Sequence, residues 1–482
     1  MYICGIMKKT LFFGISFLMC SIWAKSQTYI LYGTTYGGGT YGNGTIFSYN
    51  LSSGKEGVLI NFDTLNGIGP LGNLIQDTAS KLLYATTYGG GANNYGIVFS
   101  YDPATNKDST LFMFNGLNGK WPGQGSLYGN NGYLYGMTNG GGRYGFGTLF
   151  SYNKISGKDS VIINFDTSSG KEYGPLGTSL TLNPSNGLLY GMTYSGGKNN
   201  TGSIFSFDPA TGKDSVVISL DSSTGTQPQE GTLILDPINK SFYGVTSSGG
   251  IHNNGVLFKY DLVKGKDSAV INFNFSNGYY PYGGLMYDSL NGLFYGLTSA
   301  GGLYDYGILY SFDPVSGKQN VLFNFNDTLG SSPSGNITLG PNGKLYGLAN
   351  NDQNGNGLLF RYDPVAAKYS VLFYFNYTNG SGPYGSLTLV TNPVVTSANA
   401  VAGSNNTRIY PNPFTTNTML SFNEGGIHYV EIDNIEGQEI SSFKCGTRNY
   451  ELQRRQLATG IYFVKIYDAQ RSFISASKII VQ

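Results

Sequence analysis

One segment recurs seven times along this chain, and its period limits the possible folds more than any other feature. The copy from Leu188 to Asp221 reads LLYGMTYSGGKNNTGSIFSFDPATGKDSVVISLD. Aligned on the tyrosine of the LYG-like triplet, the copies follow one another at steps of 52, 51, 55, 53, 52 and 51 residues. The aligned tyrosines are Tyr32, Tyr84, Tyr135, Tyr190, Tyr243, Tyr295 and Tyr346. A period of about 50 residues with strand-forming content is typical of β-propeller blades rather than of helical repeats.

Each repeat contains four short segments with strand character. In the copy above, the second, third and fourth strands are expected at 189–194, 203–207 and 216–220. An Asp-Pro turn closed by a glycine, Asp208–Lys213, joins the third strand to the fourth. The first strand begins near a glycine in six repeats: Gly72, Gly177, Gly231, Gly283, Gly335 and Gly385. We expect this strand to be the innermost, where blades converge and bulky side chains do not fit.

The number of strands predicts how the two ends of the repeat region meet. The chain enters at a second strand, from Tyr29, so its first repeat lacks a first strand. After the seventh repeat one extra first strand remains, Pro383–Val390. If this strand pairs with the first repeat, it completes seven blades and covers an exposed sheet edge. The sequence therefore predicts an all-β, closed seven-bladed propeller over residues 27–390, and an open solenoid is the alternative.

The residues after the repeats differ in composition. Residues 391–407 are small and polar without periodicity, and we interpret them as a linker. Residues 408–482 contain several short strand-like segments, which predict a small Ig-like β-sandwich.

The N-terminus has the features of a signal peptide over residues 1–26. Lys8 and Lys9 precede an apolar run, Thr10–Trp23, and Ala24 and Ser26 favour cleavage before Gln27. A lipoprotein signal at Cys20 is the alternative, and Met7 is a second possible start. After cleavage only Cys445 remains, so no intramolecular disulfide is expected.

Composition excludes several classes of function. Charged residues make up 12% of the chain and the net charge is +1, so nucleic acid and anionic membrane surfaces are not expected partners. No transmembrane segment is expected in the mature chain, because no other apolar run approaches about 20 residues. No cofactor or metal site is expected, and the protein is expected to be a monomer.

No catalytic constellation is found among the residues that carry chemistry. The chain has two histidines, His252 at a loop tip and His428 in the tail, and neither has a triad pattern around it. The recurrent acids of the Asp-Pro turns are interpreted as turn caps rather than glycosidase carboxylates. The paired glycines after each second strand join antiparallel strands, with no helix to present its N-terminus to a phosphate.

A binding face is predicted where the repeats differ from one another. In a four-stranded meander, the second-to-third loops and the fourth-to-first loops emerge on the same face. These loops carry rings, amides and a few charges that could bind a glycan or an extended peptide. The candidate ligand-binding residues are Tyr41, Asn94, Tyr95, Trp121, Arg143, Tyr144, Phe146, His252, Tyr279, Tyr304, Asp305 and Tyr306. Ordinary polar turns are the alternative interpretation.

The repeat is similar to that of kelch propellers, although the tryptophan of the kelch fourth strand is replaced here by Ser215, Ser268 or Val321. It more closely resembles the bacterial GloVer-type tandem repeats, marked by LYG-T-x-x-GG-x(4)-G-x-x-F over Leu31 to about Asp363. That resemblance implies an exported repeat protein and no established reaction.

The tail resembles the C-terminal sorting domain of the type IX secretion system of Bacteroidetes. The resemblance rests on the YPNP segment, the turn from Asn434 to Gln438, the segment LATGIYFVK from Leu457, and the final KIIVQ. The motif residues are Tyr410, Pro411, Asn412, Pro413, Gly437, Gly460, Tyr462, Lys465 and Lys478. The resemblance implies the Sec and type IX secretion machineries as partners, removal of the tail, and release or attachment at the extracellular face of the outer membrane.

The sequence thus predicts an exported propeller that acts as a binding scaffold for a glycan or a protein. A polysaccharide-active hydrolase or lyase and a structural surface-coat protein are the alternatives. Several Asp-Ser/Thr-apolar triplets, such as those at Asp63 and Asp159, resemble an O-glycosylation signal and equally fit turns and strand starts.

Overall fold

The computed structural model describes residues 27–123, 125, 127–166, 177–393, 407–422, 425–434, 439–454, 457–470 and 473–481. All regular secondary structure in these ranges is β-strand. Residues 27–392 form one compact unit, and the residues from Pro393 onward belong to a second. The predicted signal peptide and most of the predicted linker lie outside the described residues.

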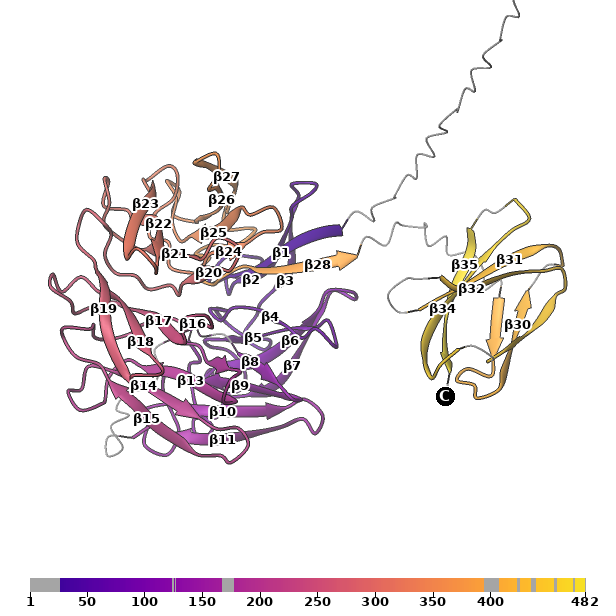
Figure 1. Cartoon of the computed structure of the whole chain (residues 1–482), viewed down its shortest axis with the longest axis horizontal. Helices are drawn as coiled ribbons and strands as arrows, with labels where there is room; N and C mark the ends of the chain where they lie inside the picture. Colours follow the sequence, from indigo (N-terminus) through magenta and orange to yellow (C-terminus); the bar gives the residue numbers. More distant parts are fainter. Residues whose placement is uncertain are drawn as a thin grey trace, which may run out of the picture. The chain divides into compact units, whose positions relative to one another are not determined.

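The first unit consists of seven four-stranded sheets (Figure 1). Six are each formed by one repeat, and the first takes one strand from the end of the repeat region. The first three sheets are β28 (Thr388–Pro393), β1 (Gln27–Thr35), β2 (Thr45–Asn50), β3 (Glu56–Asn61); β4 (Ile75–Gln76), β5 (Leu83–Thr87), β6 (Ile97–Asp102), β7 (Lys107–Met113); and β8 (Tyr128–Asn130), β9 (Tyr133–Met137), β10 (Thr148–Asn153), β11 (Lys158–Asn164). The next two are β12 (Thr181–Asn183), β13 (Leu188–Thr193), β14 (Ser203–Phe207), β15 (Asp214–Ser219); and β16 (Ile234–Asp236), β17 (Ser241–Thr246), β18 (Val256–Asp261), β19 (Lys266–Asn272). The last two are β20 (Met286–Asp288), β21 (Leu293–Thr298), β22 (Ile308–Asp313), β23 (Lys318–Asn324); and β24 (Thr338–Leu339), β25 (Leu345–Ala349), β26 (Leu358–Asp363), β27 (Lys368–Tyr374).

The extra strand β28 closes the ring, as the strand count predicts. It pairs with β1 at the edge of the first sheet. One apolar cluster lies between each neighbouring pair of sheets, including the last and the first, where Phe47 and Leu387 pack with Leu359 and Phe375. Short first strands such as β4, β8 and β16 lie near the middle, and fourth strands such as β11, β15 and β19 lie outside (Figure 1). The predicted all-β, propeller-like fold is confirmed, and the pairing of β28 with β1 joins the end of the repeat region to its start.

The repeat consensus follows from one cross-strand contact. Gly191 in β13 pairs with Phe205 in β14, and a β-carbon added to Gly191 would lie 2.6 Å from Phe205 Cζ. The same pairing recurs at Gly33 and Phe47 and in four further repeats. The aromatic ring of the third strand therefore fills the space left by the missing side chain of the glycine. This contact explains both the glycine of LYG and the aromatic residue of the third strand.

The predicted crowding near the innermost strands is also present. A β-carbon on Gly335 would lie 2.3 Å from the carbonyl oxygen of Gly385, and one on Gly283 would lie 2.5 Å from that of Gly335. Ser386 joins the blades on either side of it, because its Oγ accepts a hydrogen bond of 2.7 Å from Asn336 N and its own N–H donates to Asn73 Oδ1. The backbones of neighbouring blades thus approach too closely for larger residues.

The recurrent Asp-Pro acids cap turns, as interpreted from the sequence. Asp208 Oδ1 accepts a hydrogen bond of 2.9 Å from Ala210 N, and Asp102 and Asp313 make the equivalent bond. Hydrogen bonds from Thr211 and from the turn backbone hold the pKa of Asp208 below its ordinary value. These acids are consequently parts of the scaffold.

The Asp-Ser/Thr-apolar triplets occupy strand starts and turns. Asp159 and Ser160 lie in β11, where Asp159 Oδ2 accepts a hydrogen bond of 2.9 Å from Asn118 of the preceding repeat. Asp63 caps the turn after β3 through Leu65 N at 2.8 Å. The triplets at Asp63 and Asp159 therefore have structural roles.

The second unit is a two-sheet sandwich, as predicted. One sheet has the order β29 (Thr407–Tyr410), β30 (Asn417–Phe422), β33 (Asn449–Gln453), and the other has the order β32 (Glu439–Cys445), β31 (His428–Asp433), β34 (Gly460–Tyr467), β35 (Phe473–Val481). Leu420 and Leu452 from the first sheet pack against Ile432, Val464 and Ile479 from the second. The free thiol of Cys445 is buried in this core.

Candidate functional site

The second-to-third loops and the fourth-to-first loops lie side by side on one face of the first unit. Asn139 N donates to Trp121 O at 3.1 Å, and Ser299 N donates to Tyr280 O at 3.0 Å. Trp121 and Tyr280 occupy the same repeat position, directly before a proline. This position has a positive φ in every described repeat, at Gly69, Trp121, Gln227, Tyr280, Ser332 and Gly382. The backbone is therefore constant at a position where the side chain varies. We call this surface the loop face.

Two of the predicted site residues hold the loop tips in shape. Asn94 Oδ1 accepts a hydrogen bond of 2.8 Å from Gly90 N, and Asp305 Oδ1 accepts one of 3.0 Å from Gly301 N. Asn200 and Asn253 occupy the same place in other repeats. All four residues have the positive φ that Asn and Asp tolerate better than most side chains. His252 is exposed and immediately precedes Asn253.

The predicted rings of the tips lie on separate blades. Tyr41, Tyr144, Tyr304 and Tyr306 are exposed on the first, third and sixth repeats. The Arg143 guanidinium lies 5.4 Å from the centre of the Tyr144 ring. Phe146 is half-buried and packs against the cluster between the third and fourth sheets. These side chains do not line the pocket described below.

Tyr95 and Trp121, both predicted, belong to one aromatic cluster. The Trp121 ring stacks on Tyr88 with centroids 6.4 Å apart and meets the edge of Tyr95 at 6.2 Å. The Lys120 ammonium group lies 4.2 Å from the centre of a Trp121 ring. The indole is thus engaged by three neighbours within the protein, which leaves it 36% exposed.

A concave site lies elsewhere on the loop face and draws on four blades. It is a cavity of about 410 Å³ formed by residues just before β16, β20, β24 and β28 and just after β21 and β25. The lining residues are Glu230, Tyr280, Tyr282, Ser299, Ala300, Ser332, Ser334, Asn350, Asn351 and Tyr384. We call this cavity the loop-face pocket, and its volume lies within the range typical of small-molecule sites.

Tyrosines and small polar groups shape the loop-face pocket. The rings of Tyr280 and Tyr282 lie nearly parallel, 8° apart in plane with centroids separated by 5.7 Å. Tyr384 meets Tyr36 edge to face at 6.0 Å. Asn350 Nδ2 donates to Ser334 Oγ at 3.0 Å. Predicted Tyr279 supports the pocket from behind, because it lies 4.9 Å from Tyr280 and is hydrogen-bonded to Asp305.

Glu230 is the one carboxyl group among the described lining residues. Its backbone has a φ of +59°, an uncommon conformation for a side chain of this size. Burial raises the pKa of Glu230 to about 7, although a hydrogen bond from Gln229 opposes this. Burial also raises the pKa of Tyr282 and Tyr384, and the nearby charge of Glu230 adds to both effects. A carboxyl of raised pKa in a cleft is a recurrent feature of functional sites.

Sequence reasoning missed Glu230, Tyr282, Asn350 and Tyr384. A comparison of repeats at the start of the first strand would have found some of them. The residue after the proline varies from Leu71 through Gln229, Tyr282 and Ser334 to Tyr384. In repeats such as Pro333–Gly335 and Pro383–Gly385, a single residue separates the proline from the next glycine. In the repeat of Glu230 there are two such residues, Gln229 and Glu230, so Glu230 is an inserted residue.

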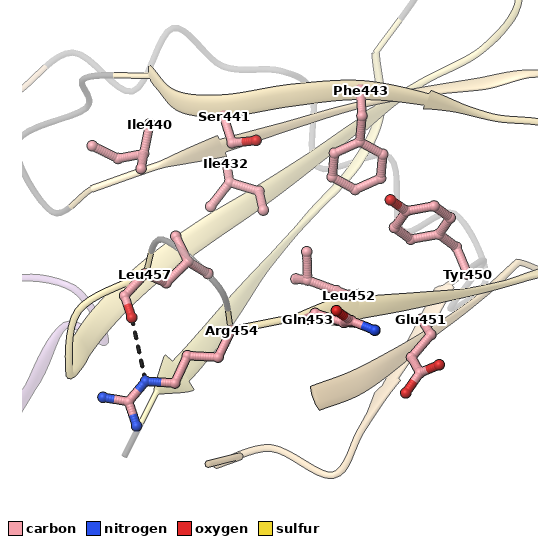
Figure 2. A pocket seen from close by; sticks show the side chains of 10 residues that line it. All are labelled: Ile432, Ile440, Ser441, Phe443, Tyr450, Glu451, Leu452, Gln453, Arg454 and Leu457. Carbon is pink, nitrogen blue, oxygen red and sulfur yellow. Dashed lines mark hydrogen bonds between the residues drawn. The ribbon is translucent and has the colours of Figure 1, made fainter. Parts of the chain in front are cut away.

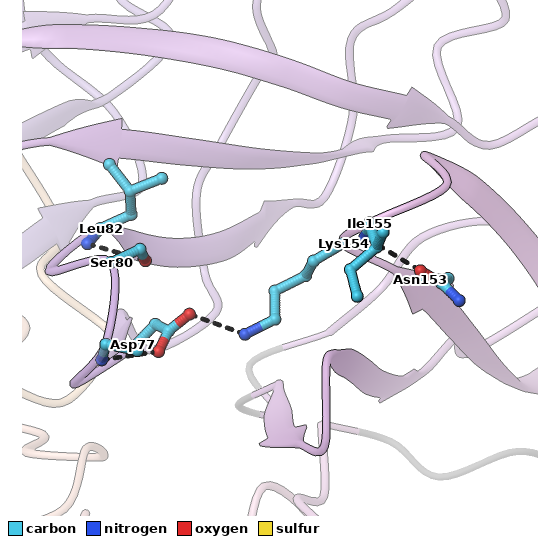
Figure 3. Close-up of polar contacts among 7 residues, drawn as sticks. Asp77, Ser80, Leu82, Asn153, Lys154 and Ile155 are labelled. Carbon is cyan, nitrogen blue, oxygen red and sulfur yellow. Dashed lines mark hydrogen bonds and ion pairs between the residues drawn. The ribbon is translucent and has the colours of Figure 1, made fainter. Parts of the chain in front are cut away.

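The described ion pairs of the first unit do not involve Glu230. Asp77, between β4 and β5, pairs with Lys154, between β10 and β11, at 2.6 Å (Figure 3). Hydrogen bonding from Lys154 holds the pKa of Asp77 at about 2. This pair joins two neighbouring blades at the ends of the strands opposite the loop face.

The sorting-motif residues of the second unit have structural contacts. Asn412 Oδ1 accepts a hydrogen bond of 2.8 Å from Ile480 N, and Thr418 Oγ1 donates to Pro411 O at 2.6 Å. The Tyr410-Pro411 and Asn412-Pro413 peptide bonds are cis, and the Tyr410 ring is exposed. These contacts attach the YPNP segment to the final strand β35. The last residues of β35 belong to the KIIVQ segment of the sorting motif.

Further motif residues lie in β34. Gly460 begins the strand, and Tyr462 is buried with its hydroxyl donating to Ala458 O at 3.0 Å. Lys465 pairs with Glu431 at 2.9 Å and with Asp433, which is buried. Burial alone would lower the pKa of Lys465, but hydrogen bonds to these two carboxylates raise it above its ordinary value. Gly437 and the Lys478 side chain lie outside the described residues.

The second unit also contains a cavity, of about 530 Å³ (Figure 2). It opens between the edge strands β32 and β33, one from each sheet, and is lined by core residues such as Ile432 and Leu452. The rings of Phe443 and Tyr450 stack at 4.5 Å on one side, and Arg454 Nε lies 3.4 Å from Leu457 O on the other. The cavity is thus the open side of the sandwich.

Metal-binding clusters and membrane-spanning helices are both absent from the described residues. No group of three or more His, Cys, Asp or Glu side chains within those ranges is placed to hold a metal ion. In the same part of the chain, no helix has the length and apolar character to cross a membrane.

Comparisons with known proteins agree with the repeat and tail observations. The Gloeobacter/Verrucomicrobia repeat family matches residues 22–181 and 177–410, and the secretion system C-terminal sorting domain matches residues 408–482. No curated protein matches the chain.

Solved structures share the fold at low identity. Proposed 6-phosphogluconolactonases from Bacteroides uniformis and Bacteroides fragilis each align with a TM-score of 0.52 and 15% identity, covering 76% of this chain and 99% and 98% of theirs. PorZ, a surface component of the type IX secretion system of Porphyromonas gingivalis, aligns with a TM-score of 0.44 and 15% identity, over 91% of this chain and 63% of its own. The chain therefore belongs to the Gloeobacter/Verrucomicrobia repeat family and carries a C-terminal sorting domain that directs it to the cell surface or the extracellular space.

Proposed function

We propose that this exported propeller is a binding protein whose ligand is a glycan held in the loop-face pocket. The observation that supports this proposal is the lining itself, in which three tyrosines alternate with serine and asparagine side chains. Aromatic rings can stack on the apolar face of a sugar ring, and amides and hydroxyls can hydrogen-bond its hydroxyl groups. The location of the pocket on the loop face agrees with the face expected from the variable loops.

A glycan array probed with the purified exported chain tests this function. We expect binding to one or a few glycans, and loss of that binding in Tyr282→Ala. Tyr144→Ala is the matched control, because it removes an exposed tyrosine of the same face that does not line the pocket. An array without any signal, or a signal that Tyr144→Ala removes and Tyr282→Ala retains, would contradict the proposal.

Polysaccharide cleavage is the second candidate, and Glu230 favours it, since a carboxyl with a raised pKa can serve as a general acid. A glycosidase normally uses two carboxyl groups about 5–9.5 Å apart. Among the lining residues that the structure describes, Glu230 has no carboxyl partner, which supports binding over hydrolysis. Release of reducing ends from a polysaccharide panel, abolished by Glu230→Gln, would establish cleavage instead.

A further inference from the structure

The loop-face pocket contains an acid without a cationic partner. Glu230 lines the pocket, and no lysine or arginine is among the other lining residues that the structure describes. None of the ion pairs in the described ranges includes Glu230. Partial burial disfavours the ionised form of Glu230 and raises its pKa. A cation bound in the pocket would stabilise that ionised form.

Aromatic rings line the same pocket. Tyr280 and Tyr282 present nearly parallel rings, and Tyr384 lies close enough to Glu230 for the carboxylate charge to affect its pKa. The faces of tyrosine rings attract cations, and combined rings and acids recognise ammonium groups. Burial raises the pKa of Tyr282 and Tyr384, so both hydroxyls stay uncharged and do not compete with Glu230 for a cation.

From these contacts we infer that the loop-face pocket selects an amino sugar whose free, protonated amine pairs with Glu230 between the tyrosine rings. This inference rests on the proposed function and deepens it by naming the class of glycan. The amine supplies the charge that Glu230 lacks, while Asn350, Asn351 and the serines remain available for the sugar hydroxyls. An N-acetylated sugar of the same skeleton offers no charge, so the pocket should discriminate against it.

Calorimetric titration of the exported chain with two oligosaccharides tests the inference. The probes are the β-1,4-linked tetramer of glucosamine and the corresponding tetramer of N-acetylglucosamine, both at pH 7, where part of the Glu230 carboxyl is ionised. We expect the glucosamine tetramer to bind at least tenfold more tightly. Glu230→Gln should bring the two dissociation constants to within about twofold of each other, because the amide retains the shape but removes the charge.

Asp327→Asn is the matched control. It also removes one negative charge from the loop face, because Asp327 is exposed in the turn after β23, and it is not among the residues that line the pocket. The tenfold preference should survive in Asp327→Asn, which would separate a local pairing from general attraction of a cationic oligosaccharide. A preference lost equally in both variants would overturn the inference.

The outcomes distinguish this inference from the proposed function. Equal or tighter binding of the N-acetylated tetramer, unchanged in Glu230→Gln but lost in Tyr282→Ala, would overturn amine selection and leave glycan binding in place. Binding of neither tetramer, together with an array without signal, would overturn both.

Discussion

Phe205 occupies the space that a side chain on Gly191 would need, with its Cζ atom 2.6 Å from the position of the missing β-carbon. Because the ring is buried, it cannot move away without disturbing the packing between two blades. Gly191→Val should therefore lower the free energy of unfolding by about 2–3 kcal/mol, the usual range for overpacking a core. Urea denaturation followed by tyrosine fluorescence measures this change.

Gly57→Val provides the comparison for Gly191→Val. Gly57 also lies in a strand, β3, but its added β-carbon would meet only Ser48 Oγ, at 3.8 Å. Valine favours strands, so this variant should be as stable as the unaltered protein or slightly more stable. Equal losses in both variants would show that the Gly191–Phe205 contact does not explain the consensus glycine.

The architecture could be predicted from the sequence because each blade is a local unit. Steps close to 52 residues fix the repeat, and the surplus strand around Leu387 fixes how the ring closes. The role of turn acids such as Asp208 could also be predicted from the sequence, since their hydrogen-bond partners lie two or three residues away.

The loop-face pocket could not be predicted in the same way because its lining comes from four repeats. Glu230 and Tyr384 are separated by more than 150 residues in sequence, and only ring closure places both at one cavity. Conversely, Asn94 and Asp305 stood out as variable tip residues, but their side chains bond to their own loops. Variation between repeats therefore identified the correct type of loop without identifying the concave part of the face.

The closing strand should contribute directly to stability through Leu387. This side chain is buried in the cluster between the last and first sheets. Leu387→Ala should lower the free energy of unfolding by about 2–4 kcal/mol, as for other buried leucines. Leu290→Ala is the control, because Leu290 is 92% exposed and should lose almost nothing. Indistinguishable denaturation curves for the two variants would mean that the Leu387 side chain, which immediately precedes β28, does not help to hold the ring closed.

The Asp77–Lys154 pair predicts a specific dependence on pH. The pKa of Asp77 is about 2 in the folded protein, below its ordinary value of 3.8. The pair therefore stabilises the fold fully above pH 3.8, and this contribution disappears as pH falls through 2. Asp77→Asn should cost ~1 kcal/mol at pH 7 and nothing at pH 2, measured by urea denaturation at both values.

Lys264→Met is the control for the ion-pair measurement. Lys264 also pairs with an aspartate, Asp261, but at 3.5 Å and with 76% of the lysine side chain exposed. Its removal should change stability by less than about 0.5 kcal/mol at either pH. A cost of Asp77→Asn that persists unchanged at pH 2 would refute the assignment to charge pairing.

Lys465 should be essential to the sorting domain for a structural reason. It neutralises Glu431 and buried Asp433, which would otherwise face each other in one strand. Lys465→Met should lower the stability of the second unit by about 2–4 kcal/mol, because it leaves a buried carboxylate unpaired. Thermal unfolding followed by circular dichroism measures the loss, and Lys444→Met, on the neighbouring strand β32 beside the Tyr429 ring, is the control. Equal melting temperatures for Lys465→Met and Lys444→Met would contradict this role.

Glu230 should destabilise the free protein at neutral pH. Its pKa rises from 4.5 to about 7 on folding, so ionisation favours the unfolded state. The penalty is absent below pH 4.5, grows between pH 4.5 and 7, and is constant above. Glu230→Gln should thus raise the free energy of unfolding by about 1–3 kcal/mol at pH 8 and leave it unchanged at pH 4.

Thermal unfolding of the two proteins at pH 4 and pH 8 checks this prediction for Glu230. The difference between the two pH values separates charge from packing. A packing change in Glu230→Gln would alter stability at both pH values, whereas the charge effect appears only at pH 8. If Glu230→Gln stabilises the protein equally at both pH values, burial of the charge is not the cause.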